Sequence, residues 1–526
     1  MRKLFIIACD YLVDRLAGPA ARAWSNPCLL GRLSVTCLRP FRAVLSSAAI
    51  ALLAPAAHGQ DVHPESLPTA GILGFEFVHL PGGERMGLIG GSLLFDIGSN
   101  WGIGPGVYGA VTGRRGGLFV GGVELQRRWG LGNGFALATG LFAGGGGGAQ
   151  APVGNGLMLR PALTLLKDIG QTFQLGLSWS SVRFPSGEVH SNQLGLMLGW
   201  RQEFLHLSGS GAVPTSSTLP SMGLGFDRMA ATASTYRFAD ADGRRVSLVG
   251  ARAERRSNID GFTWGMEAAA ATRGDAAGYM EILGTTAFSV APIASVLPTW
   301  RIGVRLGAGA GGGGAVPAGG GLIGKAVGTM EWRPAAAWTI GADYGVVRSR
   351  SALLAHQAQL WVGMDLEPGL EGRNGPPARV VRTEWVGAWQ HHTRITRSDG
   401  TRQSLDTIGL KLNRYLGEHV YLSGQAHSAF AGGAGAYSVG LLGVGVSGSP
   451  APSLRIGAEA LIGAAGGGGV KMAGGSIAQG LTWAAWQPGR VGELRVGLGA
   501  ARALHSGHAG PVVEVSWSRA FGMAGR

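Results

Sequence analysis

Residues 301–309, RIGVRLGAG, decide the fold of this chain. Apolar side chains stand at every second position and arginine or glycine stands between them: Ile302, Val304, Leu306 and Ala308 against Arg301, Gly303, Arg305, Gly307 and Gly309. Because successive side chains of a β-strand point to opposite faces, this alternation indicates a strand with one oily face and one polar or small face. The same pattern recurs in TFQLGLSW (172–179) and in ELRVGLGA (493–500).

Composition supports a sheet protein. The 526 residues include 94 Gly, with 45% hydrophobic and 14% charged residues. Such an excess of glycine disfavours a helical bundle and an ordinary α/β enzyme, and the apolar content argues against disorder. Glycine also interrupts every long apolar stretch after the first 59 residues, so a polytopic helical membrane protein is not expected.

The first 59 residues predict an upstream extension followed by a secretory signal peptide. Arg39 and Arg42 precede the apolar run 43–57, and a small-residue cleavage site ends before Gln60. A lipoprotein site at Cys9 is disfavoured, because the apolar run before it is short. All three cysteines lie in this leader, so the exported chain would have no disulfide, no thiolate metal ligand and no cysteine nucleophile.

Two landmarks recur three times in the remaining chain. Glycine runs stand at Gly144–Gly148, Gly311–Gly314 and Gly466–Gly469, and upstream of each lies a glycine-flanked aromatic turn, near Phe119, Tyr279 and Tyr437. Such self-similarity indicates internal duplication. The predicted organisation is a leader at 1–59, barrel repeat 1 at 60–200, a linker at 201–227, repeat 2 at 228–366, a linker at 367–378, and repeat 3 with the C-terminal strand at 379–526.

Each repeat holds about eight strand candidates of membrane-spanning length, which predicts an all-β, antiparallel transmembrane β-barrel protein of about 24 strands. Two closures fit this count: one large barrel, or three eight-stranded barrels in tandem. Precedent favours the single large barrel. The closure decides whether an open lumen can exist.

Strands with one apolar and one polar face also occur in soluble β-sandwiches, so the prediction of a lipid environment rests on further features. These are the export signal, turns marked by Asp-Gly, Gly-Asp and Pro, and aromatic residues near strand ends. The predicted interfacial girdle comprises Trp129, Trp200, Trp300, Trp332, Trp338 and Trp483, with Trp101 as a further member.

The C-terminal run VVEVSWSRAF (512–521) places Val513, Val515, Trp517 and Phe521 on one parity. It resembles the terminal strand of bacterial outer-membrane β-barrel proteins, which commonly ends on an aromatic residue and serves as the assembly signal. This chain departs from that pattern because GMAGR follows Phe521. The resemblance is one of class and implies an outer-membrane location, with membrane lipid, lipopolysaccharide and the barrel assembly machinery as partners.

No catalytic, cofactor or metal site is predicted, and we expect no enzyme activity. The string Glu188-Val-His190-Ser191-Asn192 loosely resembles the His-x-Ser-Asn motif of outer-membrane lipid A deacylases, but it lacks the intervening residue. Neighbouring strand residues point to opposite faces, which disfavours an imidazole–hydroxyl pair. No Lys-Ser or Lys-Thr follows the glycine runs, so they do not fit phosphate loops, and we expect them to let strands bend at a rim.

The polar parity supplies the candidate lumen-lining residues: Arg252, Glu254, Arg301, Arg305, Lys411, Arg455, Glu459, Glu493 and Arg495. In small barrels such residues pair into a plug, whereas in large barrels they line water and bias permeation toward anions. Two functions follow. The favoured one is a porin-like or export channel for small anionic solutes or a polymer such as a polysaccharide. The alternative is a structural or surface-interaction barrel without an open pore; an outer-membrane hydrolase is a distant third, and nucleic-acid binding is not expected.

Overall fold

The structure, a computed structural model, describes residues 60–210, 222–239, 243–292, 297–335, 337–350, 353–366, 379–487, 492–505 and 509–525. The predicted signal peptide lies outside these ranges, as do the second linker and residues 211–221 of the first. Within these ranges, no helix has the length and the hydropathy that a membrane-spanning helix requires.

The all-β prediction is confirmed. The described residues form strands β1 to β24, and the short 3-10 helix η4 (Pro81–Gly83) is the helical element among them. The first eight strands are β1 (Gln60–His79), β2 (Arg85–Gly98), β3 (Trp101–Thr112), β4 (Phe119–Gly132), β5 (Phe135–Gly147), β6 (Leu157–Ile169), β7 (Phe173–Arg183) and β8 (His190–Ser210).

The second set is β9 (Arg228–Phe238), β10 (Arg245–Arg256), β11 (Phe262–Arg273), β12 (Met280–Val290), β13 (Trp300–Gly312), β14 (Leu322–Ala335), β15 (Trp338–Ser349) and β16 (Leu354–Asp365). The third set is β17 (Arg379–Thr396), β18 (Arg402–Tyr415), β19 (Val420–Ala431), β20 (Ser438–Ala451), β21 (Leu454–Gly466), β22 (Ser476–Trp486), β23 (Glu493–Ala503) and β24 (Ala509–Gly525). The described strands therefore fall into three sets of eight.

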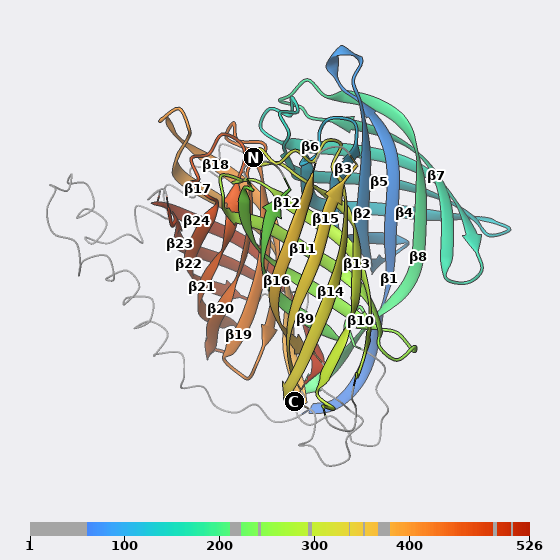
Figure 1. The fold of residues 1–526 in the computed structure, drawn as a ribbon. Helices are drawn as coiled ribbons and strands as arrows, with labels where there is room; N and C mark the ends of the chain where they lie inside the picture. The colour runs from blue at the N-terminus through green and yellow to red at the C-terminus, as the bar shows by residue number, and fades with distance from the viewer. Residues whose placement is uncertain are drawn as a thin grey trace, which may run out of the picture. The chain divides into compact units, whose positions relative to one another are not determined.

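Each set closes on itself. Within a set every strand pairs antiparallel with the next, and the last strand returns to the first: β8 to β1, β16 to β9 and β24 to β17. We call these closed sets barrel 1, barrel 2 and barrel 3; Figure 1 separates them by colour as blue to green, green to yellow and orange to red. Among the described residues, strands of different barrels pair at one point, Gly522 of β24 with Leu207 of β8.

This pairing corrects the preference for one large barrel, and the arrangement is the alternative of three eight-stranded barrels. The pairing of β8 accounts for the outcome. One edge of β8 pairs with β7 and the other with β1 from Gly195 to Ser210, so little free edge remains for a long pairing with a strand of another barrel. The same pairing shifts a predicted boundary: the first linker was expected from Arg201, but β8 continues through Ser210.

Short turns set the register on the side of the barrels where β1, β9 and β17 begin. Between β4 and β5, Gly132 pairs with Phe135, and Asn133 and Gly134 have φ values of 51° and 72°. Two successive residues with positive φ define the type I′ hairpin turn, for which Asn-Gly is the preferred sequence. The local sequence therefore fixes this hairpin and the parity of both strands.

The two faces predicted for the strand at residues 301–309 are present in the structure. Val304 and Leu306 are 56% and 55% exposed on the outside of barrel 2, whereas Arg305 is 1% exposed inside it. The other barrels follow the same rule, as Leu196 (70% exposed) beside Gln193 (7%) shows on β8. An apolar outer face around a polar interior is the arrangement of a transmembrane β-barrel and the reverse of a soluble protein.

Candidate functional site in the barrel interiors

The interior of barrel 2 is filled by a network of buried charges centred on Arg252 of β10. The Arg252 guanidinium donates from Nε to Glu267 (2.7 Å) and from Nη2 to Asp343 (2.9 Å), and its Nη1 lies 3.6 Å from Glu254. Lys325 donates to the other oxygen of Glu267 at 2.6 Å. These partners come from β11, β14 and β15 as well as β10, so the network crosses the barrel.

A second arginine continues the network toward the side where β9 begins. Arg305 of β13 donates to Glu254 and lies 3.6 Å from Asp343. The fully buried indole of Trp361 donates to Asp343 at 3.0 Å, and the guanidinium carbon of Arg252 lies 5.3 Å from the centre of its ring. Cation–π contact and hydrogen bonding thus hold the tryptophan within the ionic layer.

Both ends of the barrel 2 network are also paired. Toward the start of β9, Arg228 donates to Asp365 at 2.9 Å. Toward the other side, Tyr236 and Tyr279 each donate to Glu281 at 2.7 Å. Beyond these tyrosines lies a buried apolar cluster that includes Leu248, Ile323 and Val347.

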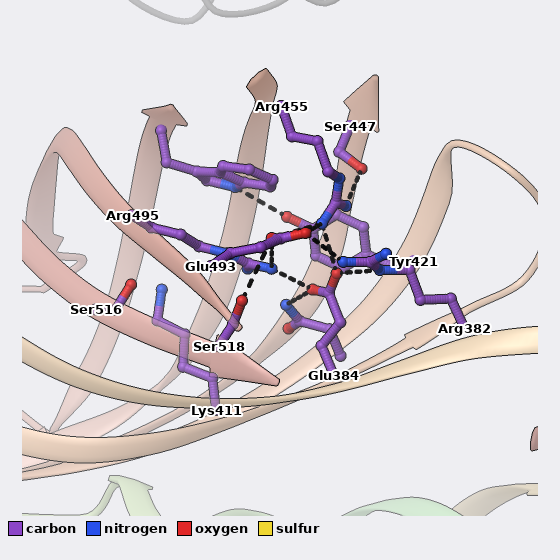
Figure 2. Close-up of polar contacts among 12 residues, drawn as sticks. Arg382, Glu384, Lys411, Tyr421, Ser447, Arg455, Glu493, Arg495, Ser516 and Ser518 are labelled. Carbon is purple, nitrogen blue, oxygen red and sulfur yellow. Dashed lines mark hydrogen bonds and ion pairs between the residues drawn. The ribbon is translucent and has the colours of Figure 1, made fainter. Parts of the chain in front are cut away.

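Barrel 3 repeats this principle with different residues, and Figure 2 shows its central network. Glu384 of β17 accepts from Arg382 (2.6 Å) and from Arg455 (2.9 Å), and it pairs with Arg495 at 2.8 Å. Glu493 accepts from the same three arginines. Two carboxylates therefore share three guanidinium groups inside the barrel.

A second ion cluster lies in the same lumen. Lys411 pairs with Glu514 at 2.7 Å and with Glu459 at 3.2 Å, and all three side chains are at most 3% exposed. Glu459 also accepts a hydrogen bond from Tyr421 at 3.0 Å. Charges on five strands of barrel 3 are thus neutralised within its interior.

Barrel 1 has fewer charges and an apolar layer. Arg160 of β6 makes two hydrogen bonds to Glu76 of β1, at 2.8 and 2.9 Å, and Ser180 donates to the same carboxylate at 2.6 Å. Closer to the start of β1 the interior holds a cluster of buried apolar residues: Ile72, Leu94, Ala138, Leu166 and Met197. This layer separates the ionic cluster from the mouth of the barrel.

A polar cavity of about 470 Å³ lies at that mouth. Its lining includes Asp96, Trp101, Arg128 and Arg201, contributed by β2, β3, β4 and β8. Arg201 pairs with Asp168 at 2.7 Å, and Arg128 donates to Gln174. The cavity has the size and lining of a small polar vestibule.

The structure places all nine candidate lumen residues on inward positions, but as members of ion pairs. Eight of them belong to the networks just described. The ninth, Arg301, lies at the mouth of barrel 2, where it donates to the carbonyl of Ser289 at 2.7 Å. Their positive charges are offset by acids that the sequence analysis did not single out, chiefly Glu267, Asp343 and Glu384. A usable signal existed: Glu267 stands on the opposite parity from the outward Trp264 and Met266.

Five of the six predicted girdle tryptophans lie on the outer faces of the barrels. All five are near strand ends, on the side where β1, β9 and β17 begin. Trp129, Trp332 and Trp338 are 36–41% exposed, Trp300 stacks on Trp332 with ring centres 6.0 Å apart, and Trp200 lies across from Phe173. Amphipathic rings at one level of the apolar surface suit a membrane interface.

The sixth, Trp483, corrects the prediction. It is 5% exposed, and it points into barrel 3, where its indole donates to Tyr421 at 3.2 Å and the guanidinium of Arg495 lies 4.5 Å from its ring centre. The physical reason is the parity of β22: Trp483 shares the inward parity with Leu481, whereas the outward parity carries the small residues Ala478, Gly480 and Ala484 and ends on the exposed Trp486.

The predicted terminal strand forms β24, but it continues beyond Phe521 to Gly525 by pairing with β17. Trp517 is 48% exposed on the outer face. Phe521, by contrast, is buried against Phe204 of β8, with ring centres 4.7 Å apart. Phe521 thus lies where barrels 1 and 3 meet; its role as an assembly signal stays a prediction.

The hydrolase-like string forms no catalytic arrangement in the structure. Ser191 faces inward, where its hydroxyl donates to Gln193 and accepts from the backbone of His79, whereas His190 is exposed on the other face. Groups of three or more His, Cys, Asp or Glu residues suited to a metal ion do not occur in the described part of the chain.

The fold and these interiors define a class: the chain consists of antiparallel transmembrane β-barrels with apolar outer faces. Similar solved structures are outer-membrane proteins of Pseudomonas aeruginosa. OccK9 (OpdG) is 12% identical, with a TM-score of 0.21 and coverage of 88% of this chain and 99% of that one. The outer-membrane protein OpdK is 10% identical (TM-score 0.23; 87% and 99%), and the siderophore receptor PirA is 11% identical (0.26; 86% and 80%). At these identities and TM-scores the similar structures carry no argument about the role of this chain. No protein-family model and no curated protein matches this sequence.

Proposed function

We propose that the protein is an outer-membrane protein with a structural or surface-interaction role, whose barrels are sealed and do not conduct in the resting state. One observation supports this most: the charged side chains at the centres of the barrel 2 and barrel 3 networks are inaccessible to water. Arg252 is 0% exposed and Glu384 is 0% exposed by their side chains. In a water-filled channel, residues at these central positions would be in contact with the solvent.

The contacts also oppose opening of the lumen. Separating one partner from a buried, hydrogen-bonded ion pair costs about 3–5 kcal/mol. A path through barrel 2 would have to displace Arg252 from Glu267 and Asp343, and then Arg305 from Glu254. The sum of several such costs holds the closed state against thermal fluctuation.

The outer face supports membrane residence of each barrel. Apolar side chains project from strands of all three barrels, as Leu196, Leu360 and Leu498 show by exposures of 70%, 67% and 56%. Membrane lipid would cover this surface, and lipopolysaccharide and the barrel assembly machinery remain the proposed partners.

Electrical recording in a planar bilayer tests the proposal. We expect the purified, folded protein to leave the membrane non-conducting at all moderate voltages, with folding verified by heat-modifiable electrophoretic mobility. A matched variant, Arg252→Ala with Arg305→Ala, removes two side chains that cross barrel 2 and serves as the test that an opened barrel would be detected. Steady unitary currents from the native protein would overturn the sealed state.

Barrel 1 carries the one observation that favours the porin-like alternative. Its vestibule of about 470 Å³ presents Arg128 and Arg201. The Glu76–Arg160 pair and a buried apolar cluster on each side of it separate this vestibule from the far side. If the native protein conducts small anions through barrel 1, we expect the Arg128→Gln variant to show a lower permeability ratio of anions to cations in the bilayer recording. A channel elsewhere would be insensitive to this change.

A further inference from the structure

The two landmarks that recur in the sequence occupy equivalent places in the three barrels. The glycine runs end the fifth strands, β5, β13 and β21, and lead into loops that we call glycine loops (148–156, 313–321 and 467–475). The turns between third and fourth strands span 113–118, 274–279 and 432–437, and we call them aromatic turns after Tyr279 and Tyr437. In barrel 1 the equivalent position is Leu118, and Phe119 follows it as the first residue of β4. Both kinds of segment lie on the side of the barrels opposite the start of β1.

The glycine loop of barrel 2 contacts the aromatic turn of barrel 1. The amide of Gly116 donates to the carbonyl of Gly319 at 2.8 Å. A Cβ added to Gly116 would lie 2.5 Å from the same oxygen, and one added to Gly312 would lie 2.5 Å from the Gly116 carbonyl carbon. The two backbones therefore meet at a distance that only glycine permits.

The glycine loop of barrel 1 makes the corresponding contact with barrel 3. The amide of Gly433 donates to the side-chain oxygen of Asn155 at 2.9 Å. A Cβ on Gly145 would lie 2.6 Å from the carbonyl oxygen of Ser428, and one on Gly156 would lie 2.6 Å from that of Ala429.

The glycine loop of barrel 3 contacts barrel 2 in the same way. The Ser476 hydroxyl donates to the carbonyl of Thr272 at 2.8 Å. A Cβ on Gly466 would lie 2.7 Å from the carbonyl carbon of Ala277, and one on Gly474 would lie 2.9 Å from the Thr272 oxygen.

These three contacts form a closed cycle: barrel 2 on barrel 1, barrel 1 on barrel 3, and barrel 3 on barrel 2. The match extends to single residues, because the last glycine of each loop faces the carbonyl of an equivalent buried alanine: Gly321 and Ala110, Gly156 and Ala429, Gly475 and Ala271. A head-to-tail contact that returns to its start after three steps is the geometry of a threefold ring, here within one chain.

We propose that glycine loop and aromatic turn are the two halves of a docking device, and that three copies of it hold the barrels together as a single-chain counterpart of a trimer. This goes beyond the proposed role in the membrane, since it assigns a function to the glycine runs: close backbone approach between barrels. In the described part of the chain, each of the three loops and each of the three turns is already occupied. The protein therefore needs no second copy to complete the ring.

The other connection between barrels lacks this repetition. The bridge between Gly522 and Leu207, with Phe521 packed on Phe204, joins barrels 1 and 3 on the side where β1 begins. Barrel 2 has no equivalent strand pairing to either neighbour among the described residues. Retention of barrel 2 is accordingly the sensitive measure of the docking device.

The test cuts the chain and asks whether barrel 2 stays. Protease sites are inserted within 211–221 and within 367–378, and the full-length protein is folded in detergent and then cleaved at both. We expect barrel 2 to co-elute with barrels 1 and 3 as one particle containing one copy of the chain. Release of folded barrel 2 from the cleaved native protein would overturn the proposal.

Variants assign the retention to the glycines. Gly116→Val and Gly466→Val together crowd both contacts of barrel 2, and both residues have ordinary negative φ values, so the change tests space and not backbone strain. The matched control is Gly387→Val with Gly440→Val, where an added Cβ meets nothing within 4 Å. We expect the first pair to release barrel 2 after cleavage and the control to retain it.

Heat-modifiable mobility of each fragment shows whether the barrels themselves remain folded. Loss of barrel 2 with all fragments still folded supports docking through the glycine contacts. Equal retention in the docking pair and the control would show that the glycines serve only to bend their own strands. If the docking pair fails to fold, Gly116→Ala with Gly466→Ala, which adds one carbon at each contact, gives the same comparison through a partial release.

Discussion

Replacing Arg252 with methionine tests whether the buried ion network stabilises barrel 2. Arg252 is fully buried and links three acidic residues, Glu267, Asp343 and Glu254, at 2.7, 2.9 and 3.6 Å. Methionine keeps much of the length of the side chain but removes the charge and the donors. The change leaves three buried carboxylates with one cation fewer.

The expected magnitude follows from the partners that remain. Removing one member of a buried ion pair costs about 3–5 kcal/mol. Each carboxylate keeps another partner: Lys325 for Glu267, Trp361 for Asp343 and Arg305 for Glu254. We therefore expect the lower end, a loss of about 3 kcal/mol in the free energy of unfolding of barrel 2.

Urea unfolding of the detergent-solubilised protein, followed by limited proteolysis of barrel 2, measures this loss. Arg245→Met is the matched control, because Arg245 lies on the same strand and is exposed. Its replacement should change stability by less than about 0.5 kcal/mol. Equal stability of the two variants would refute the view that the ionic core holds the lumen closed.

Three further outcomes are expected. Glu384→Gln removes a carboxylate shared by three arginines, so the urea midpoint of barrel 3 should fall as for a loss of about 3–5 kcal/mol. Phe521→Ala removes the ring that packs on Phe204, and we expect the contact between barrels 1 and 3 to weaken by about 3 kcal/mol, seen as easier separation of the cleaved chain. Brominated lipid should quench part of the tryptophan fluorescence, because the indole of Trp338 faces lipid whereas that of Trp483 faces the lumen. We expect the quenched component to be lost in Trp338→Phe and retained in Trp483→Phe.

Strand character and facing were predictable because they depend on local chemistry. The alternation around Arg305 determines which side chains face the interior whatever the strand pairs with, and Asn133-Gly134 determines a hairpin by the φ values that these two residues tolerate. The same reasoning failed for Trp483, because most of the outward parity of β22 is made of small residues, and Trp483 lies with Leu481 on the inward parity. A parity argument identifies the two faces of such a strand without saying which one meets lipid.

The purpose of the glycine runs could not be derived from their own sequence. Flexibility of a single strand suffices to explain one run such as Gly466–Gly469, so bending at a rim was the local interpretation. The partner of Gly466 is the aromatic turn at Gly278, separated from it by almost two hundred residues, and no local pattern pairs them. The sequence does show that a glycine run and an aromatic turn occur together in each repeat, as expected of the two halves of one contact.

Closure was the decisive unknown, and it changes the meaning of the same residues. An alternating strand is equally compatible with a small or a large ring, because parity says nothing of which strand closes the ring. In a ring of eight strands the opposite walls are near enough for Arg252 on β10 to reach Asp343 on β15 at 2.9 Å. In a ring of about 24 strands the same arginine would face water and attract anions. Closure therefore decides whether the basic residues on the polar parity line a water-filled channel or pair across a narrow lumen. The return of β8 to β1, of β16 to β9 and of β24 to β17 gives three rings of eight strands, which supports the proposal of sealed barrels.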